Sequence, residues 1–414
     1  MSTTILIIGL IVFFSHFLSL QFRRTRIPDA LVLMLVGILV GPILGIVIPQ
    51  DFGKAGSVIA TIALVVILFE GGTSLKLRTL GESLGTTGLL SITCFILTTA
   101  IVALVGYFAL ELGLLPALML GITLGGTTSA VVIPMVAALR LPEKPATILV
   151  LESALTDVLC IVGVFALLQI YTHGSTDPGR IIGSVLASLL IAALFGVLGG
   201  IGWLMVLGKI RDFPNTISST LAYVFIVYGL TEMLGFSGAI AALALGISVT
   251  NYEKFGLQRF RSIDEGIEPL NQMDFAFYSE AVFLLKTYFF IYLGISIHFG
   301  DIFLAVIALT TVLVVYVMRL VITSFIFRDA SYGLREAAVI SMLVPKGLAA
   351  AVLANIPLQY GVEGGEVIRD VTYMAVFISI VLTALLVMVY PLSGIKNFYS
   401  RVLGKPLSSE TIGE

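Results

Sequence analysis

The sequence predicts an all-α polytopic membrane protein with about 13 transmembrane helices, on the strength of its composition and its recurring apolar segments. Only 12% of the 414 residues are charged and 58% are hydrophobic, and the mean hydropathy is +1.10. Soluble domains carry about 25% charged residues. Runs of roughly 20 apolar residues, long enough to cross a bilayer, recur along the whole chain.

The predicted spans are joined by short polar connections, and only the turn MLGFSG separates the eighth from the ninth. They cover residues 4–21, 28–48, 56–75, 86–108, 115–138, 146–171, 181–208, 215–233, 236–251, 275–297, 302–327, 334–357 and 370–393. We expect a single transmembrane unit over 1–414. It consists of two inverted six-helix repeats, about 1–171 and about 215–393, joined by a linking helix at about 181–208. Residues 394–414 form a short tail.

The charges in the loops predict the orientation of the chain. Most of the 23 Lys and Arg residues lie in loops after odd-numbered spans or in the tail, whereas loops after even-numbered spans hold only Lys54, Arg180 and Arg369. Because cytoplasmic loops are enriched in Lys and Arg, this distribution places the N-terminus outside and the C-terminus in the cytoplasm.

Composition also argues against several classes of function. A net charge of −2 leaves no basic face for nucleic acid. Cys94 and Cys160 both lie in apolar runs, and we expect core thiols rather than a disulfide. His16, His173 and His298 show no metal-ligand spacing, so no cofactor is expected.

Among the charged residues inside the predicted spans, where a charge costs about 2.5–3.5 kcal/mol on insertion scales, six are candidates for a role within the membrane. They are Glu70, Glu152, Asp157, Lys286, Arg319 and Lys346. Acids at this depth indicate functional sites, although some of these residues can simply form buried ion pairs. For Lys286, such a pair or snorkelling toward the interface is an open alternative to a functional role.

The sixth predicted span carries oxygen ligands on one side of its helix. In LESALTD, a turn of about 100° per residue puts Glu152 beside Thr156 and Ser153 beside Asp157, all within a sector about 140° wide. Carboxylates and hydroxyls are hard ligands, which suit an alkali cation or a proton and no soft metal.

The fifth and twelfth spans are predicted to be interrupted. LGGTTSAVVIPMV (124–136) contains paired glycines, three consecutive hydroxyl residues and a proline, and SMLVPKGLAAAVLANIP (341–357) has Pro345 and Gly347 on either side of Lys346. Each span is the fifth of its repeat, and matched broken helices point to the midplane site of a transporter. Freed carbonyls and half-helix ends there can bind a cation.

At these motifs the chain resembles monovalent cation/proton antiporters of the NhaP and NHE type, the cation/proton antiporter-1 family, over essentially its whole length. The matching segments occur in the order typical of that family: ILFEGGTSLKLRTL (67–80), GGTTSAVVIP, ESALTD, SGAIAALALGISVTN (237–251), FFIYLGISI (289–297) and VPKGLAAAVLA. The resemblance implies crossing discontinuous helices 5 and 12, alternating access and a homodimer. We expect an integral protein of a prokaryotic plasma membrane that serves pH homeostasis.

The resemblance also implies roles for individual residues. Asp157 is similar to the aspartate of the family that binds the cation and the proton. Glu152 and Ser153 match the first two positions of the signature Glu-Ser-x-x-Asn-Asp. Thr127 or Thr128 resembles the threonine at the crossing of the broken helices.

Two ion pairs are implied in the same way, and two positions depart from the family pattern. Arg319 is similar to the arginine that pairs with Glu152, and Glu70 resembles the acid that pairs with the basic residue of the twelfth span, here Lys346. Thr156 stands where the family has asparagine, and Lys346 where it usually has arginine. The first departure bears on selectivity. The second bears on stoichiometry, because a buried lysine can lose its proton and arginine practically cannot.

With both pairs formed, Asp157 alone lacks a basic partner, so a cation and a proton compete for its charge. Burial favours the neutral form of a carboxyl group, which helps the proton to compete. We therefore expect sodium/proton exchange, one cation for one proton and electroneutral, at a site of Asp157, Thr156, Ser153, Thr127 and Thr128. Potassium is the alternative cation, because either ion accepts oxygen ligands. An electrogenic cycle follows if the lysine of the twelfth span also titrates.

Two other classes of function compete with this interpretation. Channel filters usually repeat carbonyl loops or rings of acids across an oligomer, whereas the acids here lie singly on different helices. An intramembrane enzyme would need a motif such as a metal-binding His cluster or paired catalytic aspartates, and neither occurs. The expected partners are monovalent cations, protons, the lipid bilayer and a second copy of the chain.

Overall fold

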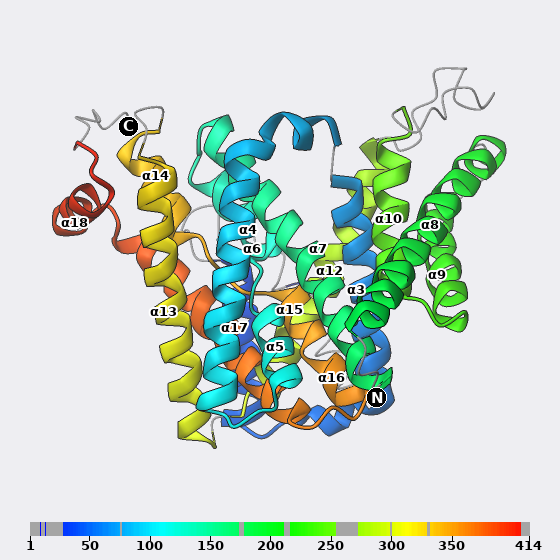
Figure 1. Ribbon diagram of the computed structural model, residues 1–414, viewed down its shortest axis with the longest axis horizontal. Coiled ribbons are helices and arrows are strands. Elements are labelled where there is room, and N and C mark those ends of the chain that lie inside the picture. Colours follow the sequence, from blue (N-terminus) through cyan, green and yellow to red (C-terminus); the bar gives the residue numbers. More distant parts are fainter. Residues whose placement is uncertain are drawn as a thin grey trace. The chain divides into compact units, whose positions relative to one another are not determined.

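The computed structural model describes residues 9, 13, 28–74, 77–173, 178–210, 216–253, 272–298, 300–328 and 332–406. Every regular element in these residues is a helix (Figure 1), which confirms the all-α class for this part of the chain. The first predicted span, 4–21, lies outside the described residues apart from positions 9 and 13.

Each later predicted span falls on one helix or on a series of shorter ones. In chain order the elements are α2 (Asp29–Ile38), the π-helical turn η1 (Leu39–Ile43), the short helix η2 (Pro49–Phe52), α3 (Gly53–Ser74), α4 (Leu77–Phe108), α5 (Leu114–Thr123), α6 (Ser129–Ala138), α7 (Glu143–His173), α8 (Pro178–Ile210), α9 (Thr216–Met233), α10 (Gly238–Thr250), α12 (Gln272–Ser296), α13 (Ile302–Ile326), α14 (Leu334–Met342), α15 (Leu348–Leu353), α16 (Asn355–Gln359), α17 (Gly365–Val389) and α18 (Ser393–Leu403).

Helix length separates continuous from interrupted spans. Among the described helices, α4, α7, α8, α12, α13 and α17 are long and apolar enough to cross a membrane. The fifth span instead divides into α5 and α6, and the twelfth into α14, α15 and α16. Residues 124–128 and 343–347, between the half-helices, are not helical. The two predicted interruptions are therefore confirmed.

The helices form two compact units that do not follow the predicted repeats. The first contains the chain up to Asp51, Ser83–Cys160 and Phe290–Glu414, and the second contains Phe52–Glu82 and Ile161–Phe289. Each unit takes segments from both halves of the sequence. The single transmembrane unit and the inverted repeats stay predictions.

Each unit contains one close helix crossing through a pair of glycines. In the second unit, a Cβ built at Gly72 of α3 or at Gly246 of α10 would run into the backbone of the other helix. In the first unit the same holds for Gly37 of α2 and Gly294, near the end of α12. Glycine is needed at these positions because two helix backbones approach there without room for a side chain.

Apolar side chains fill the rest of the second unit. Phe69 of α3, Trp203 of α8 and Tyr278 of α12 belong to one buried cluster with residues of α9 and α10. The rings of Phe69 and Tyr278 meet edge to face with their centroids 5.5 Å apart, the arrangement that aromatic quadrupoles favour. This packing holds α3, which carries Glu70, against α10 and α12.

Candidate ion-binding site

The two interrupted spans meet through their non-helical segments inside the first unit. The backbone N–H of Thr128 donates to the carbonyl of Pro345 at 2.9 Å. The ammonium of Lys346 donates to the carbonyl of Gly126 at 2.8 Å, and the backbone N–H of Lys346 donates to Oγ of Ser379 on α17 at 2.9 Å. These hydrogen bonds satisfy backbone polar groups that the breaks leave without helical partners. The hydrocarbon of a membrane could not satisfy them.

Close packing requires glycine at position 347. A Cβ built there would overlap the Cβ, Oγ1 and Cγ2 atoms of Thr128. We expect Gly347→Ala to destabilise the protein by about 1–3 kcal/mol, the usual range for overpacking. Thr128→Ala, introduced in the same chain, should recover part of that loss. Thermal unfolding in detergent measures both variants, and strictly additive losses would show that the two positions do not collide.

Thr156 joins α7 to the break in the fifth span. Its hydroxyl accepts a hydrogen bond from the N–H of Thr127 at 3.1 Å and donates to the carbonyl of Glu152 at 2.9 Å. One lone pair of this oxygen then remains for a ligand. Ser153, predicted beside Asp157, donates its hydroxyl to the carbonyl of Val150 in the same helix at 2.9 Å.

Asp157 lies one residue further along α7, where α6 begins. Its Oδ2 atom is 3.5 Å from Oγ of Ser129, the first residue of α6, so the carboxylate faces the positive end of a half-helix. No basic side chain forms an ion pair with Asp157 within the described part of the chain. Ser129 was not among the predicted ligands. In the sequence, Ser129 was notable only as the third of three consecutive hydroxyl residues that follow the paired glycines.

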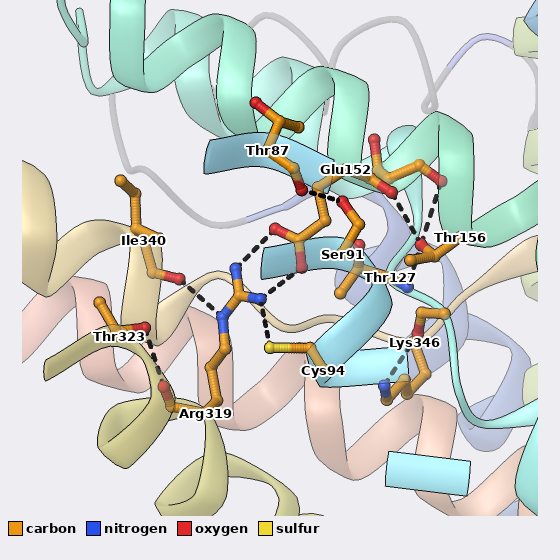
Figure 2. A network of polar contacts seen from close by, with 12 residues as sticks. Thr87, Ser91, Cys94, Thr127, Glu152, Thr156, Arg319, Thr323, Ile340 and Lys346 are labelled. Carbon is orange, nitrogen blue, oxygen red and sulfur yellow. Dashed lines mark hydrogen bonds and ion pairs between the residues drawn. The ribbon is translucent and has the colours of Figure 1, made fainter. Parts of the chain in front are cut away.

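The predicted ion pair between Glu152 and Arg319 is present and buried (Figure 2). The Arg319 guanidinium holds both carboxylate oxygens of Glu152: Nη1 contacts Oε1, and Nη2 donates to Oε2 at 2.6 Å. The side chains of Arg319 and Glu152 are 1% and 2% exposed. Arg319 also donates to the carbonyl of Ile340 at 3.2 Å and to Sγ of Cys94 at 3.1 Å. A single side chain of α13 therefore contacts α4, α7 and α14.

Helix α17 supports the break in the twelfth span from the other side. Ser379, which accepts the N–H of Lys346, donates its hydroxyl to the carbonyl of Val376 at 2.9 Å. The hydroxyl of Tyr316 on α13 donates to the carbonyl of Ser379 at 2.8 Å and lies 2.5 Å from Oγ1 of Thr383. These contacts could not be expected from the sequence, because hydroxyl residues are common in membrane helices.

The pair between Glu70 and Lys346 stays a prediction, because the two residues belong to different compact units. The ammonium of Lys346 is bound to the Gly126 carbonyl, and the charged side chain that acts electrostatically on Glu70 is Lys286. Both Glu70 and Lys286 belong to the second unit. Lys286 is buried, which argues against snorkelling. Lys286 acts on Glu70 because α3 and α12 pack together in this unit. No spacing in the sequence predicts that packing.

The prediction of core thiols is confirmed for both cysteines. Cys94 and Cys160 are buried and free. Cys94 on α4 accepts the bond from Arg319 described above. A Cβ built at Gly126 would meet Sγ of Cys160, so this thiol packs directly against the break in the fifth span.

Comparison with known proteins places this arrangement in a family. The model of the transmembrane sodium/hydrogen exchanger family matches residues 9–389. The K(+)/H(+) antiporter NhaP2 of Shewanella oneidensis is 22% identical over 377 residues, which cover 88% of this chain and 62% of that protein. The Na(+)/H(+) antiporter NhaS2 of a Synechocystis species is 23% identical over 68% of this chain and 49% of its own length. The chain thus spans less than two thirds of the curated relatives it matches.

A solved structure supports the same fold. The sodium proton antiporter MjNhaP1 from Methanocaldococcus jannaschii superposes with a TM-score of 0.71 at 20% identity, covering 98% of this chain and 99% of that one. The family and the named relatives are transporters, not enzymes. The sequence motifs, the two interrupted helices and the family match agree, and the chain belongs to the transmembrane sodium/hydrogen exchanger family.

Proposed function

We propose that this protein is a secondary active antiporter that exchanges one monovalent cation, sodium in the first instance, for one proton at Asp157. The observation that carries the proposal is that only one of the two acids on α7 has a basic partner. Glu152 is neutralised by Arg319, whereas Asp157 has no basic partner among the described residues and faces the start of α6. A cation and a proton then compete for one carboxylate, and exchange follows from alternating access to it.

The surroundings of Asp157 suit a hard monovalent cation. Ser129 offers a hydroxyl at 3.5 Å from the carboxylate, and Thr156 keeps one lone pair free. Thr127 and Thr128 complete the oxygen-bearing set at the break, and both are buried. Oxygen ligands of this kind bind alkali cations and exclude soft metals.

The paired glycine crossings support the proposed internal repeat. In the predicted repeats, α2 and α10 are the second spans of the two halves, and α3 and α12 are the third spans. The crossing of α2 with α12 and that of α10 with α3 each place one glycine of a second span against one of a third. We propose on this basis two inverted repeats within thirteen spans, with the C-terminus in the cytoplasm and a homodimer as the working unit.

Potassium/proton exchange is the second candidate. It is favoured by the relatives named K(+)/H(+) antiporters. Their alignments cover a larger share of this chain than the alignment with NhaS2, which is named a Na(+)/H(+) antiporter. The sodium assignment is supported by the structural likeness to a sodium proton antiporter. Oxygen ligands do not decide between the two ions, because selectivity depends on the size of the cavity that they enclose.

Lys346 bears on the stoichiometry of exchange. It is buried, and its ammonium donates to a backbone carbonyl, so loss of its proton leaves no anion of the first unit unpaired among the described residues. We favour an electroneutral cycle, because Asp157 alone binds both cargoes. A cycle in which Lys346 also releases its proton would move net charge.

Proton exchange in proteoliposomes tests this function. Vesicles with an acidic interior should lose their pH gradient on addition of external sodium chloride, and potassium chloride added in parallel reports the selectivity. Choline chloride is the control. The sodium-driven rate should stay nearly constant when a membrane potential is imposed with potassium and valinomycin. Absence of exchange with both cations refutes the proposal, and a strong dependence on potential would assign Lys346 a proton in the cycle.

A further inference from the structure

A cavity in the first unit lies where the half-helices α6 and α14 and the end of α17 meet α18. Its volume is about 110 Å³. Its apolar walls include Leu139, Val339, Met342 and Val387. None of the residues proposed for the ion site lines it, so it is a separate feature of the molecule.

Two cationic side chains face this cavity, and no acid lines it among the residues that the structure describes. The guanidinium of Arg335 on α14 donates to the carbonyl of Leu139 at 2.8 Å, which uses one of its five N–H donors. The ammonium of Lys396 on α18 has no hydrogen-bond or ion-pair partner among the described residues. Both side chains are partly buried. Partly desolvated cations that lack a counter-charge favour an anion in the space that they share.

The shape and chemistry of the cavity fit a phosphate group. A guanidinium fork and a neighbouring ammonium are the usual partners of phosphate oxygens. The volume is several times the roughly 30 Å³ that one water occupies. The apolar walls suit the carbon chain of an ester attached to that phosphate. Basic pockets between membrane helices on the cytoplasmic side also bind the head groups of anionic lipids.

We propose that Arg335 and Lys396 form an anion site that binds a phosphate group, supplied by an anionic phospholipid or by soluble phosphate. The bound group connects α18 to α14. The ammonium of Lys405 already donates to the carbonyl of Tyr332, just before α14, at 2.5 Å. The phosphate is thus a second connection between the C-terminal helix and the half-helix that leads into residues 343–347. Occupancy of the site stabilises the packing of α18.

Thermal unfolding of the full-length protein in detergent, after removal of native lipid, tests this site. One titration uses inorganic phosphate against sodium chloride at equal ionic strength, and another uses short-chain phosphatidylglycerol against phosphatidylcholine of the same chain length. We expect a saturable rise in the unfolding temperature with a phosphate-bearing anion. Lys396→Gln and Arg335→Gln should each weaken the apparent affinity by about tenfold or more, the scale of a lost bond to a charged group.

Arg401→Gln is the matched control, because Arg401 lies exposed on the same helix and does not line the cavity. It should titrate as the unchanged protein does. Stabilisation by inorganic phosphate identifies a site open to soluble anions, and stabilisation by phosphatidylglycerol alone identifies a lipid site. The proposal is overturned if neither anion stabilises the protein beyond its control, or if Lys396→Gln and Arg335→Gln both bind as tightly as the unchanged protein.

Discussion

Asp157→Asn abolishes cation-dependent proton exchange in proteoliposomes, on the proposed mechanism, and leaves the protein folded. Asparagine has nearly the same shape and can still accept a hydrogen bond from Ser129, which lies 3.5 Å from the carboxylate. It carries no charge for a cation to neutralise and cannot take up a proton at physiological pH. The rate of pH-gradient collapse should therefore fall to that of vesicles without protein.

Two controls make this result specific. The unfolding temperature of Asp157→Asn in detergent should be no lower than that of the unchanged protein, because burial of a charge without a basic partner does not favour folding. Ser153→Ala should keep more exchange than Asp157→Asn, since it removes a neutral hydroxyl that donates to the carbonyl of Val150 and leaves the charge of Asp157 in place. Exchange that persists in Asp157→Asn would exclude a cycle that depends on this one carboxylate.

The second large effect is expected on stability, at the buried pair of Glu152 and Arg319. Glu152→Gln leaves the guanidinium in a buried position without a counter-charge, and Arg319→Met leaves the carboxylate in the same condition. Each single change should destabilise the protein by about 3–5 kcal/mol. The double variant should lose less than the sum of the two, because it leaves no unpaired buried charge.

Chemical denaturation in detergent of the four proteins of this cycle measures the coupling between the two side chains. Arg369→Met is a matched control, since Arg369 pairs with Asp370 at 2.8 Å but both side chains are partly exposed. Its loss should be about 1 kcal/mol or less, as for other exposed pairs. Additive losses in the Glu152 and Arg319 cycle would show that the pair is not what stabilises this part of the fold.

The acids of α7 and the interrupted helices could be predicted from the sequence for a physical reason. A charge or a glycine-proline break is costly in lipid, so Asp157, Glu152 and the segments 124–128 and 343–347 are conspicuous against an apolar background. The pairing of Glu152 with Arg319 followed from the family resemblance and is present in the structure. Most boundaries of the spans that the structure describes lie within a few residues of a helix end, whereas α4 begins at Leu77, well before the predicted start at 86.

Other features depended on which helices pack together, and a single sequence does not contain that information. Lys286 acts electrostatically on Glu70 because α3 and α12 share one unit. Lys346 turns to the Gly126 carbonyl, which is free only because the fifth span breaks beside it. Ser129 acquires its position facing Asp157 from the start of α6. The residue types were visible in the sequence, but their neighbours were not.

The contacts of Arg319 have a mechanical consequence. One rigid, planar group joins α13 to the thiol on α4, the carboxylate on α7 and a carbonyl of α14. Sliding any of these helices by one turn would break a bond to a buried charge in a place where neither water nor lipid can replace it. We therefore expect the four helices to move as one rigid body. In that case, Thr156 and Asp157 on α7 keep their position relative to α4, α13 and α14 throughout the proposed transport cycle, and the passages that lead to the two membrane faces change around them.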